Sequence, residues 1–99
     1  MQFIAVVRRR TEAFSDAGFA PLLEPEAQAV RDLYARGLVR NIWSRDDVPG
    51  AVTLLEAESL EQAREIVQSY PLMRKGMLEL EQLIPLRGYR GFGPRQATK

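Results

Sequence analysis

Two short, nearly continuous apolar runs constrain the fold of this chain most strongly. They are residues 3–7 (FIAVV) and residues 51–57 (AVTLLEA), and neither shows a regular alternation of apolar and polar side chains. Runs of this length without alternation are typical of β-strands that are buried on both faces. The chain has 99 residues, which is about the size of one small domain with a modest core. The predicted sheet therefore needs cover on two sides, and a domain of this size has little chain to provide it.

Helix signals follow each of the apolar runs. Pro25 suits the first position of a helix, and Gly37 suits its C-terminal cap. Further along, residues 59–62 (SLEQ) form a capping box that starts with Ser59. The dipeptide at residues 70–71 (YP) closes this second helix. We therefore predict two helices, one that ends at Gly37 and one that begins after Ser59.

The strands and helices follow one another in the order βαββαβ over residues 1–86, which we predict to be one domain. Beside the two apolar runs, strands are expected at residues 38–45 and 77–86, whereas residues 9–23 are expected to be irregular, with a short helical turn from Thr11. This order predicts an α+β fold of the ferredoxin-like type, an antiparallel four-stranded sheet with two helices on one face. The other face then has no cover, so we predict that a second copy packs against it and forms a dimeric α/β barrel.

The residue types that are absent limit the chemistry of the chain. It contains neither cysteine nor histidine, which removes disulfides, thiol nucleophiles, histidine-based triads and the usual Cys/His metal sites. No glycine-rich phosphate loop precedes a helix. Any catalysis must therefore use carboxylates, arginine, lysine, hydroxyls or backbone groups, and we predict that it needs no metal and no cofactor.

Charge and hydropathy give no sign of a nucleic-acid or membrane partner. The net charge is +1, so no general attraction to nucleic acid or to anionic membranes is expected. No apolar run approaches the roughly 20 residues that span a bilayer. The first ten residues (MQFIAVVRRR) lack a basic segment before the apolar stretch, unlike a signal peptide. These features predict a cytoplasmic protein.

Residues 87–99 are predicted to form a basic, glycine-rich arm or tail after the domain. Within them, residues 90–93 (RGFG) match the first half of an RNA-recognition signature. That signature belongs on the third strand, where its aromatic rings stack on bases, and residues 51–57 contain no aromatic side chain. We therefore do not expect RNA binding. The alternatives are a partly disordered end, or an arm whose Tyr89 and Phe92 dock on a neighbouring subunit.

The spacing of residues in the middle of the chain resembles that of the muconolactone Δ-isomerase family. Gly37, Arg40 and Trp43 follow one another with two residues between each pair, at the start of the second predicted strand. A short turn, an apolar strand, an amphipathic helix and a proline–leucine pair follow in the same order as in the family. Two positions differ, because Ile4 and Ser44 stand where enzymes of the family carry a histidine and a second basic residue.

The resemblance implies a ferredoxin-like subunit that forms dimeric barrels, which are often assembled into larger rings. The member that names the family is a cofactor-free isomerase, which moves a double bond within a small lactone acid by transferring a proton next to a carbonyl. The implied function of this chain is cofactor-independent proton transfer, an isomerisation or cyclisation, on a small organic acid or lactone. The alternative is a non-catalytic member of the same fold that binds a small ligand or serves as an assembly subunit.

Arg40 and Glu56 are the predicted catalytic residues. Proton transfer beside a carbonyl needs a base and a group that stabilises the developing enolate. Arg40 can bind a substrate carboxylate or the enolate through paired hydrogen bonds. Glu56 interrupts an apolar strand, and apolar neighbours are expected to raise its pKa toward neutrality. The alternatives are a solvated strand end for Glu56, or a cross-strand ion pair, because residue 40 faces residue 56 if 46 faces 50.

Three aromatic residues are further candidates for substrate binding. Trp43 offers a flat pocket wall, although strict alternation points it to the face opposite Arg40 unless a bulge intervenes. The alternative for Trp43 is packing in the core or in an interface. Tyr34 lies on the apolar stripe of the first helix and can direct its hydroxyl into a cavity between helix and sheet. Tyr70 is similar, and for both tyrosines the alternative is core packing with a satisfied hydroxyl.

Overall fold

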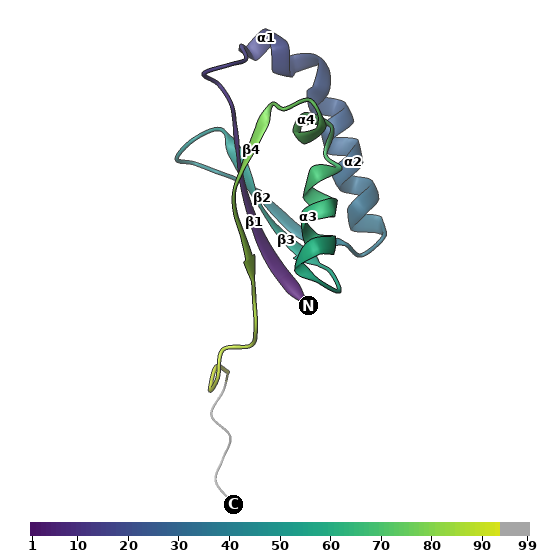
Figure 1. The fold of residues 1–99 in the computed structure, drawn as a ribbon, viewed down its shortest axis with the longest axis vertical. Helices are drawn as coiled ribbons and strands as arrows, with labels where there is room; N and C mark the ends of the chain where they lie inside the picture. Colours follow the sequence, from purple (N-terminus) through teal and green to yellow (C-terminus); the bar gives the residue numbers. More distant parts are fainter. Residues whose placement is uncertain (94–99) are drawn as a thin grey trace, which may run out of the picture.

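The computed structural model describes residues 1–93 of the chain. These residues form four strands, four α-helices and one 3₁₀ helix. Figure 1 shows their arrangement. In chain order they are β1 (Gln2–Arg9), α1 (Asp16–Phe19), the 3₁₀ helix η1 (Ala20–Leu22), α2 (Leu23–Ala35), β2 (Val39–Ser44), β3 (Gly50–Glu56), α3 (Leu60–Gln68), α4 (Pro71–Arg74) and β4 (Leu78–Pro85). None of these helices is long and apolar enough to cross a membrane.

The four strands form one antiparallel sheet in the order β2-β3-β1-β4. The two long helices, α2 and α3, lie on the same side of this sheet (Figure 1). On the opposite side, Figure 1 shows no helix or strand among the described residues. This is the α+β, ferredoxin-like arrangement that the order of elements predicts, so the predicted fold class is confirmed.

The core lies between the sheet and the helices. On β1, Phe3, Ala5 and Val7 are buried, whereas the residues between them are only half-buried. The same alternation continues on β3, where Thr53 and Leu55 are buried. The helical segments and their flanking residues add a matching set of buried side chains: Phe19, Leu33, Ala63, Ile66, Val67, Tyr70 and Leu72. The chain's own helices therefore cover the two apolar runs on one face only.

Capping interactions define the ends of the two long helices. After α2, Gly37 has a φ of 78°, and its N–H donates to the Tyr34 carbonyl at 2.9 Å. The N–H of Leu38 donates to the Leu33 carbonyl at 2.9 Å, and this second bond completes a Schellman motif. Before α3, the Ser59 hydroxyl accepts a hydrogen bond from the Gln62 N–H at 3.0 Å. The predicted end of the first helix at Gly37 and the predicted start of the second helix after Ser59 are therefore confirmed.

One predicted helix start is wrong. α2 begins at Leu23 rather than at Pro25, because the first N–H groups of a helix have no intrahelical partner and the missing N–H of Pro25 is tolerated there. The segment before it is also more regular than predicted. Residues 11–13 form only a turn, but a separate helix, α1, begins after Ser15, whose hydroxyl caps it.

A bulge changes the pairing of β2 with β3. Val39 pairs with Leu55, but Asn41 pairs with Leu54, so the register shifts between these two pairs. Arg40 is therefore the extra residue of a β-bulge. The predicted pairing of residue 40 with residue 56 is wrong for two reasons. On the turn side of the bulge the register already differs by one residue from the prediction, since Ser44 pairs with Ala51 and not with residue 52, and the bulge then leaves Arg40 without a partner of its own.

The described part of the C-terminal segment extends away from the domain beyond β4 (Figure 1). Tyr89 and Phe92 on this segment are 82% and 87% exposed, so neither ring contributes to the core of its own chain. The rest of the predicted arm, residues 94–99, lies outside the described residues.

Candidate functional site

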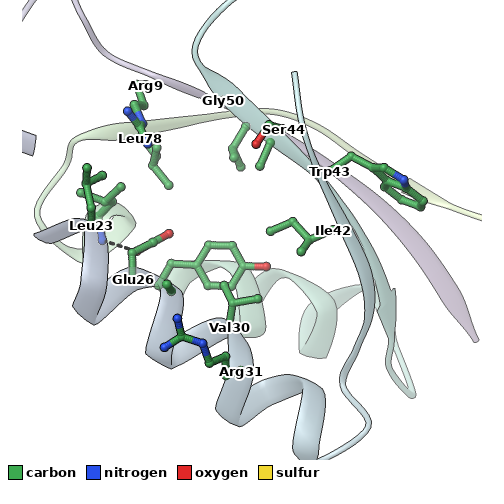
Figure 2. Close-up of a pocket in the computed structure, with 15 residues that line it drawn as sticks. Arg9, Leu23, Glu26, Val30, Arg31, Ile42, Trp43, Ser44, Gly50 and Leu78 are labelled. Atoms are coloured by element: carbon green, nitrogen blue, oxygen red, sulfur yellow. Dashed lines mark hydrogen bonds between the residues drawn. The ribbon is translucent and has the colours of Figure 1, made fainter. Parts of the chain in front are cut away.

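A cavity of about 490 Å³ lies between α2 and the β2 side of the sheet (Figure 2). Most of its wall is apolar and is formed by Val7, Leu23, Ala27, Val30, Ile42, Trp43, Ala51, Leu72 and Leu78. Its polar side chains are Arg9, Glu26, Arg31, Ser44 and Tyr70. A mostly apolar pocket of this volume with a few polar groups is the usual form of a site for a small organic ligand. Within residues 1–93, no three His, Cys, Asp or Glu side chains form a group that can hold a metal ion.

Glu26 is the carboxyl group of this cavity. It lies on α2 one helical turn before Val30, on the same face, so its side chain enters the layer between helix and sheet. Its Oε1 accepts a hydrogen bond from the Leu72 N–H at 2.9 Å (Figure 2). Burial raises the pKa of Glu26 above its ordinary value of 4.5, against the opposing effects of the Leu72 hydrogen bond and the Arg9 charge. Glu26 is thus a positioned carboxyl group with increased proton affinity.

The partner of Glu26 is an N–H group at the start of α4. Tyr70 is the N-cap residue of α4, and no side-chain capping bond is formed from that position. Pro71 has no N–H, so Leu72 carries the first N–H of this helix that needs an acceptor. Glu26, which lies 46 positions earlier in the chain, supplies that acceptor. This tertiary cap holds the Glu26 carboxylate at the cavity wall.

Tyr70 is a deeply buried member of the cavity wall. Its side chain is only 2% exposed. Burial raises the pKa of the Tyr70 hydroxyl, the charge of Glu26 raises it further, and the nearby Thr53 hydroxyl opposes both effects. Tyr70 therefore keeps its proton at neutral pH and can donate a hydrogen bond.

Arg9 brings a positive charge to the cavity. It is the last residue of β1, and its guanidinium group lies over the Phe19 ring, 5.4 Å from the ring centroid. Its charge lowers the pKa of Glu26. Arg31, the other cation of the wall, is bound to the Glu24 carboxylate at 2.9 Å. Arg9 is therefore better placed than Arg31 to attract an anionic group of a ligand.

Two of the predicted site residues, Tyr70 and Trp43, line this cavity. Ile42 and Ser44 point into it from β2, whereas the Trp43 indole is directed to the other side of the strand (Figure 2). The Trp43 side chain is 48% exposed there. Trp43 therefore belongs mainly to the outer face of the sheet, as strict alternation predicts.

Arg40 and Tyr34 lie next to each other, but they do not line the cavity of Glu26. Together with Val39 they line two smaller depressions near the C-terminal end of α2. Tyr34 is 65% exposed, so its ring is neither packed in the core nor enclosed between helix and sheet. The structure thus separates these two predicted site residues from Tyr70.

Glu56 lies at the end of β3, outside the cavity wall. Its carboxylate accepts a hydrogen bond from the Met1 ammonium group at 2.9 Å, and its side chain is 41% exposed. The hydrogen bond from this ammonium group lowers the pKa of Glu56, and the charge of Arg40 adds a smaller effect in the same direction. The predicted rise of this pKa is wrong, because the paired N-terminus outweighs the effect of burial. The ion pair of Glu56 is formed with Met1 and not with Arg40.

Glu26 and Arg9 are candidates that the sequence-based prediction lacks. The sequence does carry a signal for Glu26, because it precedes Val30 by four residues and Leu33 by seven, which places a carboxylate on the apolar stripe of the helix. For Arg9 the signal is strand alternation, since the side chains at positions 3, 5, 7 and 9 share the helix-facing side of β1.

Comparison with known proteins shows the fold of the chain. No family model matches it, and no curated protein matches it. Among solved structures it is similar to 5-chloro-2-hydroxyhydroquinone dehydrochlorinase (TftG) from Burkholderia phenoliruptrix, in complex with 2,5-dihydroxybenzoquinone, with a TM-score of 0.65. The two sequences are 19% identical, and the match covers 92% of this chain and 96% of the other. The two proteins thus share the ferredoxin-like fold over nearly their whole lengths.

Proposed function

We propose that this chain is a small-molecule enzyme that transfers a proton, without a cofactor, beside a carbonyl group of a compound bound in the cavity. The observation that carries this proposal is Glu26, a half-buried carboxyl group with a raised pKa on the wall of a mostly apolar cavity. A carboxylate with increased proton affinity suits a general base. From the resemblance in sequence, the reaction is an isomerisation or cyclisation of a small organic acid or lactone.

The geometry supports a simple route for the proton. The Glu26 carboxylate removes a proton from the carbon next to the substrate carbonyl, and the electron pair of that C–H bond forms the enolate. The Leu72 N–H holds Oε1 of Glu26, which leaves Oε2 to take the proton. Arg9 attracts an anionic group of the substrate. Return of the proton from Glu26 to a different carbon moves the double bond and regenerates the carboxylate.

The similar dehydrochlorinase supports a compact, oxygenated ring compound as the substrate class. The compound in its complex, 2,5-dihydroxybenzoquinone, is a planar ring with carbonyl and hydroxyl oxygens. A cavity of about 490 Å³ lies within the usual volume range of sites for small ligands.

Two rival hypotheses lead to different expectations. In the first, Glu56 is the base and Arg40 binds the anion, as the sequence predicts. In the second, the chain is a non-catalytic subunit that binds a small ligand or serves assembly, and Glu26 only caps α4. Glu26 is preferred as the base because it lines the cavity and its pKa is raised, whereas the pKa of Glu56 is lowered.

Deuterium exchange distinguishes these hypotheses. The purified protein is incubated with muconolactone in heavy water, and the proton NMR spectrum is followed for isomerisation or deuterium uptake. Glu26→Gln should lower the rate by about 10²- to 10⁴-fold, the usual contribution of a general base, whereas Glu56→Gln should keep the wild-type rate. Glutamine can still accept the hydrogen bond from the Leu72 N–H, so circular dichroism should show the same fold for both variants.

The other outcomes are equally informative. A loss of rate in Glu56→Gln alone would move the base to Glu56. No exchange by the wild type, together with line broadening of muconolactone that shows binding, would favour the non-catalytic role. Wild-type rates in both variants would contradict proton transfer by either carboxylate.

We also propose that a second copy of the chain covers the open face of the sheet. This face carries two rows of adjacent apolar side chains, Trp43, Val52 and Val6 in one row and Leu54, Ile4 and Ile84 in the other. Of these, Trp43 is 48% exposed and Ile84 is 40% exposed. Two such faces related by a two-fold axis can bury both rows, as in sheet-to-sheet packing.

Light scattering after gel filtration tests this dimer. The wild type should have twice the mass of one chain, and Trp43→Ala should shift the equilibrium toward the monomer at low micromolar concentration. Tyr34→Ala is the matched control, because it removes an exposed aromatic ring from α2 on the other side of the sheet. A monomeric wild type at high micromolar concentration would contradict the proposed dimer.

A further inference from the structure

Of the two arginines on the cavity wall, only one is bound to a carboxylate. Arg31 forms an ion pair with Glu24. Within residues 1–93, no carboxylate lies within ion-pairing distance of the Arg9 guanidinium, and this guanidinium donates no hydrogen bond. The Phe19 ring, 5.4 Å from it, helps to hold the guanidinium in place. The N–H donors of Arg9 are therefore available to a ligand.

The cavity wall beside Arg9 is apolar. Val7 precedes Arg9 by two residues and lies on the same face of β1. Val7 pairs with Ala51 across β1 and β3, and both line the cavity. Side chains two residues apart on a strand are about 6.6 Å from each other, which leaves room for one small ring beside the guanidinium. Ala27 and Val30 of α2 face this space from the helix side.

The two unpaired charges of the cavity orient a ligand. The charge of Arg9 acts on Glu26, yet the two side chains form no ion pair. An anionic group is attracted by Arg9 and repelled by the Glu26 carboxylate. Such a group must therefore lie at the Arg9 end of the cavity, which directs the uncharged part of the ligand toward Glu26. Among anions, a carboxylate matches the planar pair of N–H donors of a guanidinium best.

We propose that Arg9 selects the ionised carboxylate of a small cyclic acid, whose ring lies over Val7 and Ala51. The inference rests on the proposed function of the cavity and specifies its ligand, because a neutral lactone or ketone would leave the Arg9 donors unused. Arg9 then has two effects. It contributes to affinity, and it places the ring carbons next to the carboxylate on the side of the cavity where Glu26 lies.

A matched pair of ligands tests this selection. Benzoate and benzamide have nearly the same shape, but only benzoate is charged at neutral pH. NMR titration of the ¹⁵N-labelled protein should show that benzoate binds about 10- to 150-fold more tightly, the range expected for hydrogen bonds to a charged group. The Nε–H resonance of Arg9 should shift with benzoate and not with benzamide. Arg9→Gln should abolish the preference for benzoate, and Arg9→Lys, which keeps the charge but not the planar donors, should reduce it.

Arg10→Gln is the matched control. Arg10 also lies over a phenylalanine ring, that of Phe14 at 6.0 Å, but it is not part of the cavity wall. This variant changes the net charge by the same amount and should keep the full preference for benzoate. Circular dichroism checks that each variant is folded, and the Arg9 resonance of the wild type reports on the contact even if Arg9→Gln does not fold.

Several results would overturn the inference. They are equal affinity for the two compounds, no binding of benzoate at millimolar concentration, an unchanged preference in folded Arg9→Gln, and loss of the preference in Arg31→Gln instead. None of these measurements involves turnover. Glu26→Gln removes the proposed base but keeps Arg9, so it should still prefer benzoate, and failure of the proposed reaction can be distinguished from failure of this inference.

Discussion

Gly50 is a position at which one added methyl group should strongly destabilise the fold. It opens β3 directly opposite Arg8 on β1. A Cβ atom at residue 50 would overlap the carbonyl oxygen of Val7 and lie 2.9 Å from Cα of Arg8. These neighbours are backbone atoms, so no side chain can turn away to make room. Gly50→Ala must therefore push β1 and β3 apart at this end of the sheet.

The magnitude follows from the contacts that this separation disturbs. The Arg9 N–H donates to the Pro49 carbonyl at 2.8 Å, and the Arg45 N–H donates to the Gly50 carbonyl at 3.1 Å. Each hydrogen bond contributes about 0.5–1.5 kcal/mol, and overpacking costs about 1–3 kcal/mol. Gly50→Ala should therefore lower the free energy of unfolding by about 2–6 kcal/mol, a large part of the ~5–15 kcal/mol typical of a native domain.

Thermal and urea unfolding, followed by circular dichroism, measure this loss. Even the lower limit should reduce Tm by ~8 °C or more for a domain of this size. Gly88→Ala is the matched control, because no heavy atom beyond its chain neighbours lies within 4 Å of its Cβ position. It should change the free energy of unfolding by less than about 0.5 kcal/mol. Equal stability of the two variants would refute the reasoning, since the strands would then separate at no cost.

Three further predictions concern backbone strain and titration. Gly37→Ala should cost about 1–2 kcal/mol in urea unfolding, because residue 37 has a φ of 78°, where a Cβ atom is strained. The hydrogen bond from Arg8 lowers the pKa of Glu12 from 4.5 to about 2, so its stabilising effect is present above pH 4.5 and is lost as the pH falls toward 2. Glu12→Gln should flatten the stability profile over that range, and high salt should weaken the difference between the two proteins. The pH dependence is reversed for Glu26, because its pKa is raised in the folded state. Its stabilising contribution to the free energy of unfolding is complete below pH 4.5 and is lost as the pH rises through the folded pKa. Urea unfolding at several pH values should therefore show Glu26→Gln gaining stability relative to the wild type above pH 4.5.

The parts of the fold that the sequence predicts well depend on local interactions. Ser59 caps a helix through a bond to an N–H three residues later, and Gly37 ends a helix through bonds that span one turn. Such signals are complete within a few residues, so they can be interpreted without a structure. Once the elements and their order are known, few topologies can accommodate them, which is why the ferredoxin-like class follows from the sequence.

Register and electrostatics were predicted less well, because both depend on residues that are distant in the chain. One extra residue, Arg40, shifts the partner of every residue on the far side of the bulge. The pKa of Glu56 is lowered by Met1, which is 55 positions away and reaches it only because β1 pairs with β3. Neither the bulge nor this ion pair has a local sequence signal, so the facing of Arg40 and the environment of Glu56 required the structure.

Glu26 combines a structural contact with a chemical property, and the two can be separated by physical argument. Capping the N–H of Leu72 requires only an acceptor oxygen, which glutamine also has. Burial, however, raises the pKa of Glu26, so the ionised carboxylate makes the fold less stable at neutral pH than a neutral amide would. At neutral pH, a glutamate at this position therefore gives a less stable fold than a glutamine that caps the same N–H group. In the proposed function, removal of a proton is a task that a carboxylate can perform and an amide cannot, and this is the physical reason to propose Glu26 as the base.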